Sequence, residues 1–177
     1  MEKKVAKESR NIVITGPESS GKTTLFEELK ILSGFNFIPE YSRSYLEKIK
    51  RPYHYNDILQ IANKYVNELE SVTQKNISVI SDTDLLTLQV WCEYKYKKCH
   101  PFITENLTLN PPDLYLICRP NIHWEFDPQR ENPNDRIELY NIHLDKIKEL
   151  GIIFEIIEGD QSKRLNKAKK ILENLQL

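Results

Sequence analysis

The sequence predicts an α/β protein in which a five-stranded parallel sheet carries helices on both faces. The first observation is that five short apolar runs alternate with longer stretches of helical periodicity. The second is a glycine-rich segment at residues 16–23, which follows the first apolar run and precedes a helical pattern. Length agrees with this fold, because 177 residues suffice for one domain with a substantial core and not for two full-sized domains.

Each predicted strand is a short apolar run bounded by turn residues or a polar break. We expect strands at residues 11–15, 35–39, 77–81, 114–118 and 152–157. We expect helices at residues 23–32, 42–50, 55–73, 84–96, 136–150 and 163–175. Helices that connect parallel strands form right-handed crossovers, and ligands bind beyond the carboxyl ends of the strands. The residues just after each strand are therefore the candidates for chemistry.

The glycine-rich segment, Gly16-x-x-x-x-Gly21-Lys22-Thr23, has the pattern of a loop that cradles nucleotide phosphates. Glycines permit backbone angles that a Cβ obstructs, so successive N–H groups can converge on phosphate oxygens at the start of a helix. Lys22 would contact the β- and γ-phosphates, and the Thr23 hydroxyl would coordinate Mg²⁺. The predicted nucleotide-binding residues are Gly16, Pro17, Glu18, Ser19, Ser20, Gly21, Lys22, Thr23 and Thr24.

This pattern indicates the P-loop NTPase form of the fold, a three-layer sandwich, with ATP as co-substrate and Mg²⁺ as cofactor. The alternative is a Gly- and Ser-rich turn that matches the pattern by accident. The strand before the loop and the helix after it favour the nucleotide loop.

Polar residues follow the second strand at Glu40, Tyr41 and Arg43. Glu40 is the candidate to hold, and to deprotonate, an acceptor hydroxyl group. A first-turn glutamate that stabilises a helix dipole would occupy the same position, so both interpretations stay open. Arg43 could instead pair with an acidic residue of its helix, and Tyr41 could belong to the core.

The third strand ends at Asp82-Thr83-Asp84. An aspartate at the end of the strand beside a phosphate loop is the expected second ligand of Mg²⁺, alongside Thr23. Asp82 is the first candidate for metal and catalysis, and Asp84 is the alternative. A helix N-cap would explain either aspartate, but hardly both together with the strand before them.

Residues 119–136, which we call the lid segment, are polar and rich in Pro and Asn. Arg130 and Arg136 in this segment would neutralise charge on the transferred phosphoryl group while the lid segment excludes water. The alternative is a solvated loop with scattered charge.

Composition excludes several classes of partner. The formal net charge is −1, with 25 basic and 26 acidic residues, so we expect no nucleic-acid partner. The three cysteines lack metal-ligand spacing, and we expect reduced thiols. Residues 1–10 form a charged tail without the apolar region of a signal peptide, and residues 11–177 form the domain. No run approaches a membrane span, so we expect a cytoplasmic location; the sequence predicts no oligomeric state.

The order of motifs resembles the ribosylnicotinamide kinase domain of NadR-type proteins. The residues that carry the resemblance are the phosphate loop, Glu40-Tyr41-x-Arg43, Asp82-Thr83-Asp84, Thr87, Gln89, His100-Pro101-Phe102, Trp124 and Asp127-x-x-Arg130. The resemblance implies a stand-alone P-loop kinase that transfers the γ-phosphoryl of ATP to the 5′-hydroxyl of nicotinamide riboside, giving nicotinamide mononucleotide. The implied substrate-binding residues are Glu40, Tyr41, Arg43, Asp84, Trp124 and Asp127.

Two positions depart from that pattern. Pro39 stands where the family tends to carry a Trp that stacks on the nicotinamide ring, and Pro128 stands where a Gly usually follows the lid aspartate. The acceptor could therefore be another nucleoside or a small sugar. A regulatory ATPase that binds a protein partner is a further alternative, although the Asn-Lys-x-Asp and Asp-x-x-Gly elements of guanine-nucleotide switches are absent from the sequence.

Overall fold

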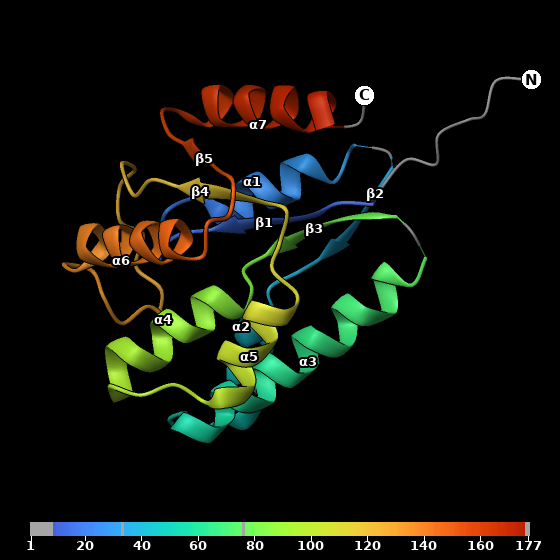
Figure 1. The fold of residues 1–177 in the computed structure, drawn as a ribbon. Helices are drawn as coiled ribbons and strands as arrows, with labels where there is room; N and C mark the ends of the chain where they lie inside the picture. The colour runs from blue at the N-terminus through green and yellow to red at the C-terminus, as the bar shows by residue number, and fades with distance from the viewer. Residues whose placement is uncertain (1–8, 33, 76, 176–177) are drawn as a thin grey trace, which may run out of the picture.

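The sheet consists of parallel strands in the order β2-β3-β1-β4-β5 (Figure 1). The computed structural model describes residues 9–32, 34–75 and 77–175, so residues 1–8 of the predicted tail lie outside it. The strands are β1 (Asn11–Thr15), β2 (Phe35–Ile38), β3 (Ser78–Asp82), β4 (Leu114–Cys118) and β5 (Phe154–Ile157). The predicted parallel sheet is confirmed, with β1 at its centre and its carboxyl end beside those of β3 and β4.

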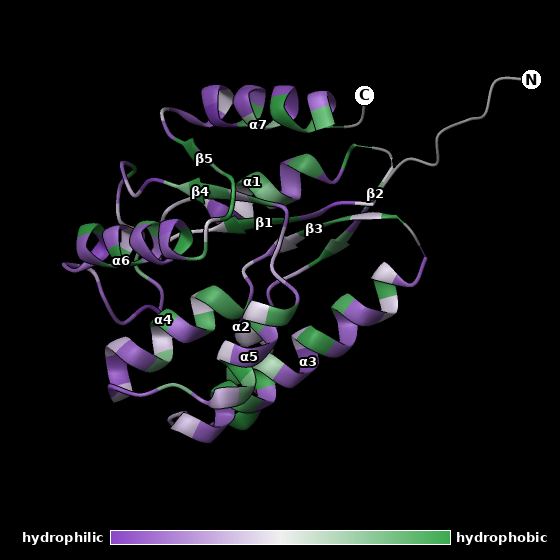
Figure 2. Ribbon diagram, viewed as in Figure 1, coloured by the Kyte–Doolittle hydropathy of each residue, from purple (hydrophilic) through white to green (hydrophobic). Residues whose placement is uncertain are grey.

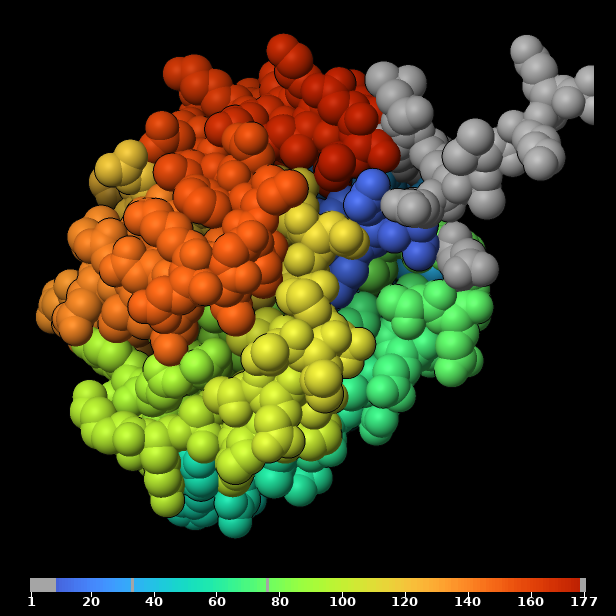
Figure 3. Space-filling view, viewed as in Figure 1, coloured from blue at the N-terminus to red at the C-terminus, as the bar shows by residue number. Residues whose placement is uncertain are grey.

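Helices cover both faces of the sheet (Figure 1). The helices α1 (Lys22–Leu29) and α7 (Gln161–Leu175) lie on one face. The other face carries α2 (Tyr41–Ile49), α3 (Tyr55–Thr73), α4 (Leu85–Tyr96), α5 (Pro101–Leu109) and α6 (Arg136–Glu149). In the space-filling view, α4 lies beside α6 and beside α5, and these pairs of helices are in contact (Figure 3). The three-layer architecture predicted from the sequence is thereby confirmed.

Each face of the sheet has its own apolar core, because neighbouring strand residues point to opposite faces. In β1, Val13 packs with the helices of the α3–α6 side, whereas Ile12 and Ile14 pack with α1 and α7. The strand β4 consists of apolar residues, and Ile12, Val13 and Ile14 give β1 an apolar centre, as expected of strands covered on both faces. Figure 2 shows that apolar residues gather along the sheet and on the helix surfaces that face it. Within the described residues, no helix combines the length and apolar character that crossing a membrane would require.

The observed elements differ from the predicted ones chiefly at α5. Its nine residues begin with Pro101, and only Ile103 and Leu107 are buried. So short an apolar stripe gives a weak periodic signal, and the sequence predicted no helix there. The strand β3 begins and ends one residue later than expected, which makes Asp82 its last residue. Gly151, with a φ angle of 67°, follows Leu150, the C-cap residue of α6, at the position where a left-handed glycine commonly ends a helix.

Candidate active site

The phosphate loop joins β1 to α1 at the carboxyl edge of the sheet. Gly16 has a φ angle of 134°, and a Cβ built on it would lie 2.7 Å from the carbonyl oxygen of Cys118 in β4. Only glycine fits at this position without a shift of backbone. Gly21, with a φ angle of 83°, is the N-cap of α1 and has no side chain to offer the first-turn amides. The loop therefore presents backbone N–H groups at the positive end of a helix.

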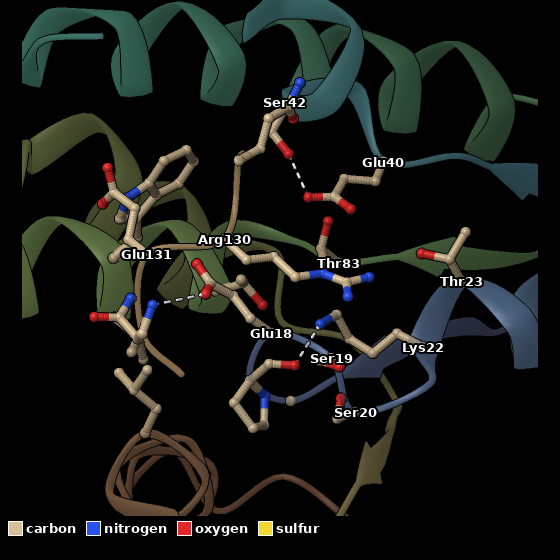
Figure 4. A pocket seen from close by; sticks show the side chains of 18 of the residues that line it. Glu18, Ser19, Ser20, Lys22, Thr23, Glu40, Ser42, Thr83, Arg130 and Glu131 are labelled. Atoms are coloured by element: carbon tan, nitrogen blue, oxygen red, sulfur yellow. Dashed lines mark hydrogen bonds between the residues drawn. The ribbon is translucent and has the colours of Figure 1, made fainter. Parts of the chain in front are cut away.

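A cavity of about 390 Å³ opens above this loop. Every predicted nucleotide-binding residue from Gly16 to Thr24 lines it. Lys22 reaches back across the loop, where its Nζ donates a hydrogen bond to the carbonyl of Pro17 at 2.8 Å (Figure 4). The ammonium group is thus held over the loop, at the position from which a lysine contacts phosphate oxygens.

Thr23 and Asp82 meet beside the loop. The Thr23 hydroxyl donates a hydrogen bond to Oδ2 of Asp82 at 2.9 Å, and β3 pairs with β1 so that Asp82 lies opposite Ile14. The Asp82 side chain is buried, and its Oδ1 has no hydrogen-bond partner in the part of the chain that the structure describes. Burial, followed by the nearby Glu40 charge, raises the pKa of the Asp82 carboxyl to about 6. The Asp82 carboxylate and the Thr23 hydroxyl are therefore suited to supply the protein oxygen ligands of a Mg²⁺ ion.

Mg²⁺ suits this pair because it binds through one or two protein oxygens, several waters and substrate phosphates. Among the described residues no group of three or more His, Cys, Asp or Glu side chains could hold a metal ion on its own. The residues thus fit a metal that arrives with a nucleotide, rather than one held by a protein cage.

Glu40 and Arg130 face each other across the cavity (Figure 4). Glu40 is the N-cap residue of α2, and its carboxylate accepts a hydrogen bond from the Ser42 hydroxyl. Arg130 extends from the lid segment toward Lys22 and Thr83 (Figure 4). Its guanidinium also donates to the Glu125 carbonyl. A carboxylate and two cationic groups therefore converge on one space, as phosphoryl transfer to a hydroxyl requires.

The lid segment lies over the phosphate loop. The backbone N–H of Asn132 donates to the Glu18 carboxylate at 3.1 Å, and that of Glu125 donates to the Ser19 hydroxyl at 3.2 Å. Desolvation by this covering raises the pKa of Glu18. A second contact joins the lid to α2, since Arg43 and Asp127 form an ion pair of 2.7 Å. The backbone N–H of Gln129 and this guanidinium lower the pKa of Asp127.

Arg136 and Trp124 lie at the root of the lid segment and outside the lining of the main cavity. The Arg136 guanidinium donates to the carbonyls of Ser19 and Ile122 at 3.1 and 3.0 Å. It also lies 5.6 Å from the centre of the Trp124 ring. In this arrangement Arg136 anchors the lid to the phosphate loop, so a contact between Arg136 and the transferred phosphoryl group stays a prediction.

Tyr41, Asp82 and Asp84 line a second, much smaller cavity of about 30 Å³, which adjoins the first at Glu40. Asp84 is the N-cap of α4: its carboxylate accepts hydrogen bonds from the N–H of Leu86 and from the hydroxyl of Tyr115, at 3.1 and 2.6 Å. Burial raises the Asp84 pKa to about 6. Both of its oxygens thus have hydrogen-bond partners within the protein, and a contact between Asp84 and a substrate stays a prediction.

Sequence reasoning assigned no role to several cavity residues in the turn after β3, on α4 and in the lid segment. Thr83 has a φ angle of 66°, a strained value for a β-branched residue that often marks a functional site. Trp91 lines both cavities, and its indole N–H donates to the Tyr53 hydroxyl at 2.7 Å. That hydroxyl also receives a hydrogen bond from Lys95, which pairs with Glu131 of the lid at 2.9 Å. The sequence pattern identifies Trp91 and Lys95 only as residues of a helix and does not indicate that they lie at a site.

The sheet order, the glycine loop and the threonine–aspartate pair together define a P-loop nucleotide-binding protein. More particularly, the chain belongs to the AAA domain family AAA_28, whose model matches residues 11–164.

Curated relatives and solved structures agree with this assignment. The trifunctional NAD biosynthesis/regulator protein NadR of Escherichia coli is 28% identical over 158 residues, which are 85% of this chain and 38% of that protein. NadR of Salmonella typhimurium is 27% identical over 174 residues, which are 94% of this chain and 42% of that protein. The chain thus spans about two-fifths of the length of these relatives. The resemblance to NadR-type proteins that the motifs predict is confirmed.

Among solved structures, a NadR protein in complex with NR has a TM-score of 0.81 at 20% identity, over 95% of this chain and 52% of that one. A NadR protein in complex with NAD and AMP-PNP has a TM-score of 0.74 at 18% identity, and the match covers 96% of this chain and 50% of that one. Thymidylate kinase from Ehrlichia chaffeensis has a TM-score of 0.63 at 16% identity, and the match covers 93% of this chain and 99% of that one. The fold is therefore that of P-loop kinases.

Because the pKa of Asp82 differs between the folded and the unfolded protein, the free energy of unfolding depends on pH. In the unfolded chain this carboxyl ionises near 3.8, but in the folded, metal-free protein it ionises near 6. As the pH rises, the unfolded state releases this proton first, so the free energy of unfolding falls between about pH 4 and pH 6, by a contribution on the order of 2 kcal/mol. Urea titrations in EDTA should find that Asp82→Asn loses less stability than the wild type across this range. Equal slopes for the two proteins would contradict the assignment.

Proposed function

We propose that this protein is an ATP-dependent kinase that transfers the γ-phosphoryl group of ATP to the 5′-hydroxyl of nicotinamide riboside. The observation that carries the proposal is the convergence of four functional elements on one cavity. These elements are the phosphate loop with Lys22, the Thr23–Asp82 pair, the Glu40 carboxylate and the Arg130 guanidinium. Such a set suits transfer of a phosphoryl group to a hydroxyl better than hydrolysis, because Arg130 and the lid segment cover the space where water would attack.

In the proposed mechanism the loop amides and Lys22 hold the phosphates of ATP, which fixes the γ-phosphorus in the cavity. Thr23 and Asp82 would hold Mg²⁺, which when bound neutralises negative charge on the phosphates. Glu40 accepts the hydrogen bond of the acceptor hydroxyl and takes its proton as the oxygen attacks in line. Arg130 stabilises the charge on the three equatorial oxygens of the transferred group. Arg43 and Asp127 keep the lid in contact with α2 while this occurs.

Nicotinamide riboside is the proposed acceptor because of the similarity to NadR proteins, one of which is described in complex with NR. Pro39 keeps a second acceptor class open. It lines the small cavity beyond Glu40 and offers no aromatic face for stacking. Another nucleoside or small metabolite would use the same phosphoryl-transfer groups, so the reaction and the acceptor are tested separately.

The acceptor is tested by a coupled ADP-release assay with Mg²⁺ and ATP. We expect nicotinamide riboside to stimulate ADP release far above a panel of other nucleosides and sugars. Lys22→Ala should lower this turnover by about two to three orders of magnitude, because it removes a charge from the phosphates in the transition state. Stimulation by a different nucleoside would overturn the acceptor but keep the kinase. ADP release that responds only to a protein would favour a regulatory ATPase instead.

Arg130 gives a separate test of the lid segment. If its guanidinium acts on the transferred group, Arg130→Ala should lower kcat by about a hundredfold or more and change the KM for ATP by less than about threefold. Arg119→Ala is the matched control, because Arg119 also belongs to the lid segment but pairs with Glu158 at 2.7 Å, outside the cavity. The account fails here if Arg130→Ala raises the KM for ATP and leaves kcat intact.

A further inference from the structure

A buried arginine, Arg164, contacts the phosphate loop and does not line the cavity. Arg164 belongs to the first turn of α7, the helix that lies beside α1 on one face of the sheet (Figure 1). Only 4% of its surface is exposed. Its contact with the proposed mechanism is with the backbone of the phosphate loop.

The Arg164 guanidinium joins three loops at the carboxyl edge of the sheet. Its Nη1 donates to the carbonyl of Ser20 in the phosphate loop at 2.7 Å. Its Nε donates to the carbonyl of Gly159, in the turn after β5, at 2.8 Å. Its Nη2 donates to the carbonyl of Arg119 at 2.8 Å and to the side-chain oxygen of Asn121, both at the root of the lid segment. One planar group thus sets the spacing of segments that are far apart in the sequence.

The Arg164 guanidinium lies close to two neighbouring residues of the phosphate loop, Ser20 and Gly21. Besides the bond to Ser20, the same Nη1 would lie 3.4 Å from a Cβ built on Gly21, the N-cap residue of α1. The guanidinium therefore lies directly behind the backbone whose amides would face the phosphates. A change in its position would move those amides.

The charge of Arg164 has no carboxylate partner. All four acceptors are neutral oxygens, and within the described ranges 9–32, 34–75 and 77–175 no ion pair includes Arg164. A buried cation is costly when no anion balances it. A triphosphate bound at the start of α1 would supply that balance from the other side of the loop.

We propose that Arg164 is a positioning residue of the nucleotide site, which ties the phosphate loop to the two loops beside it and favours a triphosphate by its buried charge. This inference rests on the proposed function, because it concerns the ATP half of the same site. The ligand class is a nucleoside triphosphate. The proposed role requires the several N–H donors of a planar guanidinium as well as its positive charge. Arg164→Lys keeps only the charge, so this variant should keep only part of the affinity for a nucleoside triphosphate.

Equilibrium titration with Mg²⁺ and a non-hydrolysable ATP analogue tests the proposal. We expect Arg164→Met to weaken binding by about a hundredfold and Arg164→Lys by about tenfold. Asn121→Ala removes one exposed partner without touching the core, and should weaken binding by about threefold. Lys167→Met is the matched control on the same helix. Lys167 also donates to a backbone carbonyl, that of Ile156, but lies away from the phosphate loop, and this variant should bind like the wild type.

Kinetics separate positioning from a general loss of folded protein. Arg164→Lys should raise the KM for ATP by about tenfold and leave the acceptor KM within about twofold, whereas partial unfolding would lower only the apparent kcat. Variants that bind the analogue as tightly as the wild type would overturn this inference while leaving the kinase proposal standing. A wild type that binds no analogue would instead remove the proposed function itself.

Discussion

The site depends on one close approach of backbone to backbone. Gly16 leaves β1 so near the Cys118 carbonyl of β4 that a side chain would collide with it. This approach places the phosphate loop across the carboxyl ends of β1 and β4, at the start of α1. The strand order then supplies the chemistry, because β3 lies beside β1 and brings Asp82 to Thr23, and β2 lies next and brings Glu40 to the cavity. A parallel sheet therefore collects groups from distant parts of the chain at one edge.

Opposite charges are placed on different sides of the cavity. Lys22 and Arg130 point into it from the phosphate loop and the lid segment, whereas Glu40 faces them from α2 (Figure 4). The buried Asp82 carboxyl is costly to ionise alone, and a divalent ion would favour its ionised form. Under the proposed function, the phosphates would lie against Lys22 and Arg130, and the metal would lie against Asp82.

Much of this organisation could be predicted from the sequence. The loop pattern predicts a strand, a turn and a helix at once, and the alternation of apolar runs with helical stretches predicts the parallel sheet. The α5 helix could not be predicted, because its apolar stripe has only two buried residues. Pairwise contacts were also out of reach. The sequence does not show that the Tyr115 hydroxyl, 31 residues away, donates to Asp84. Nor does it show that the Arg136 guanidinium donates to the carbonyl of Ser19. Such contacts depend on side chains that the fold brings together.

The central claim is that the glycine loop presents its amides and one ammonium group to a triphosphate beside a carboxylate-held Mg²⁺. Calorimetric titration of the wild-type protein with a non-hydrolysable ATP analogue, with Mg²⁺ and then with EDTA, tests it most directly. The account predicts saturable binding that weakens by about tenfold or more when Mg²⁺ is removed. A protein that binds no nucleoside triphosphate in the presence of Mg²⁺, although correctly folded, would contradict it.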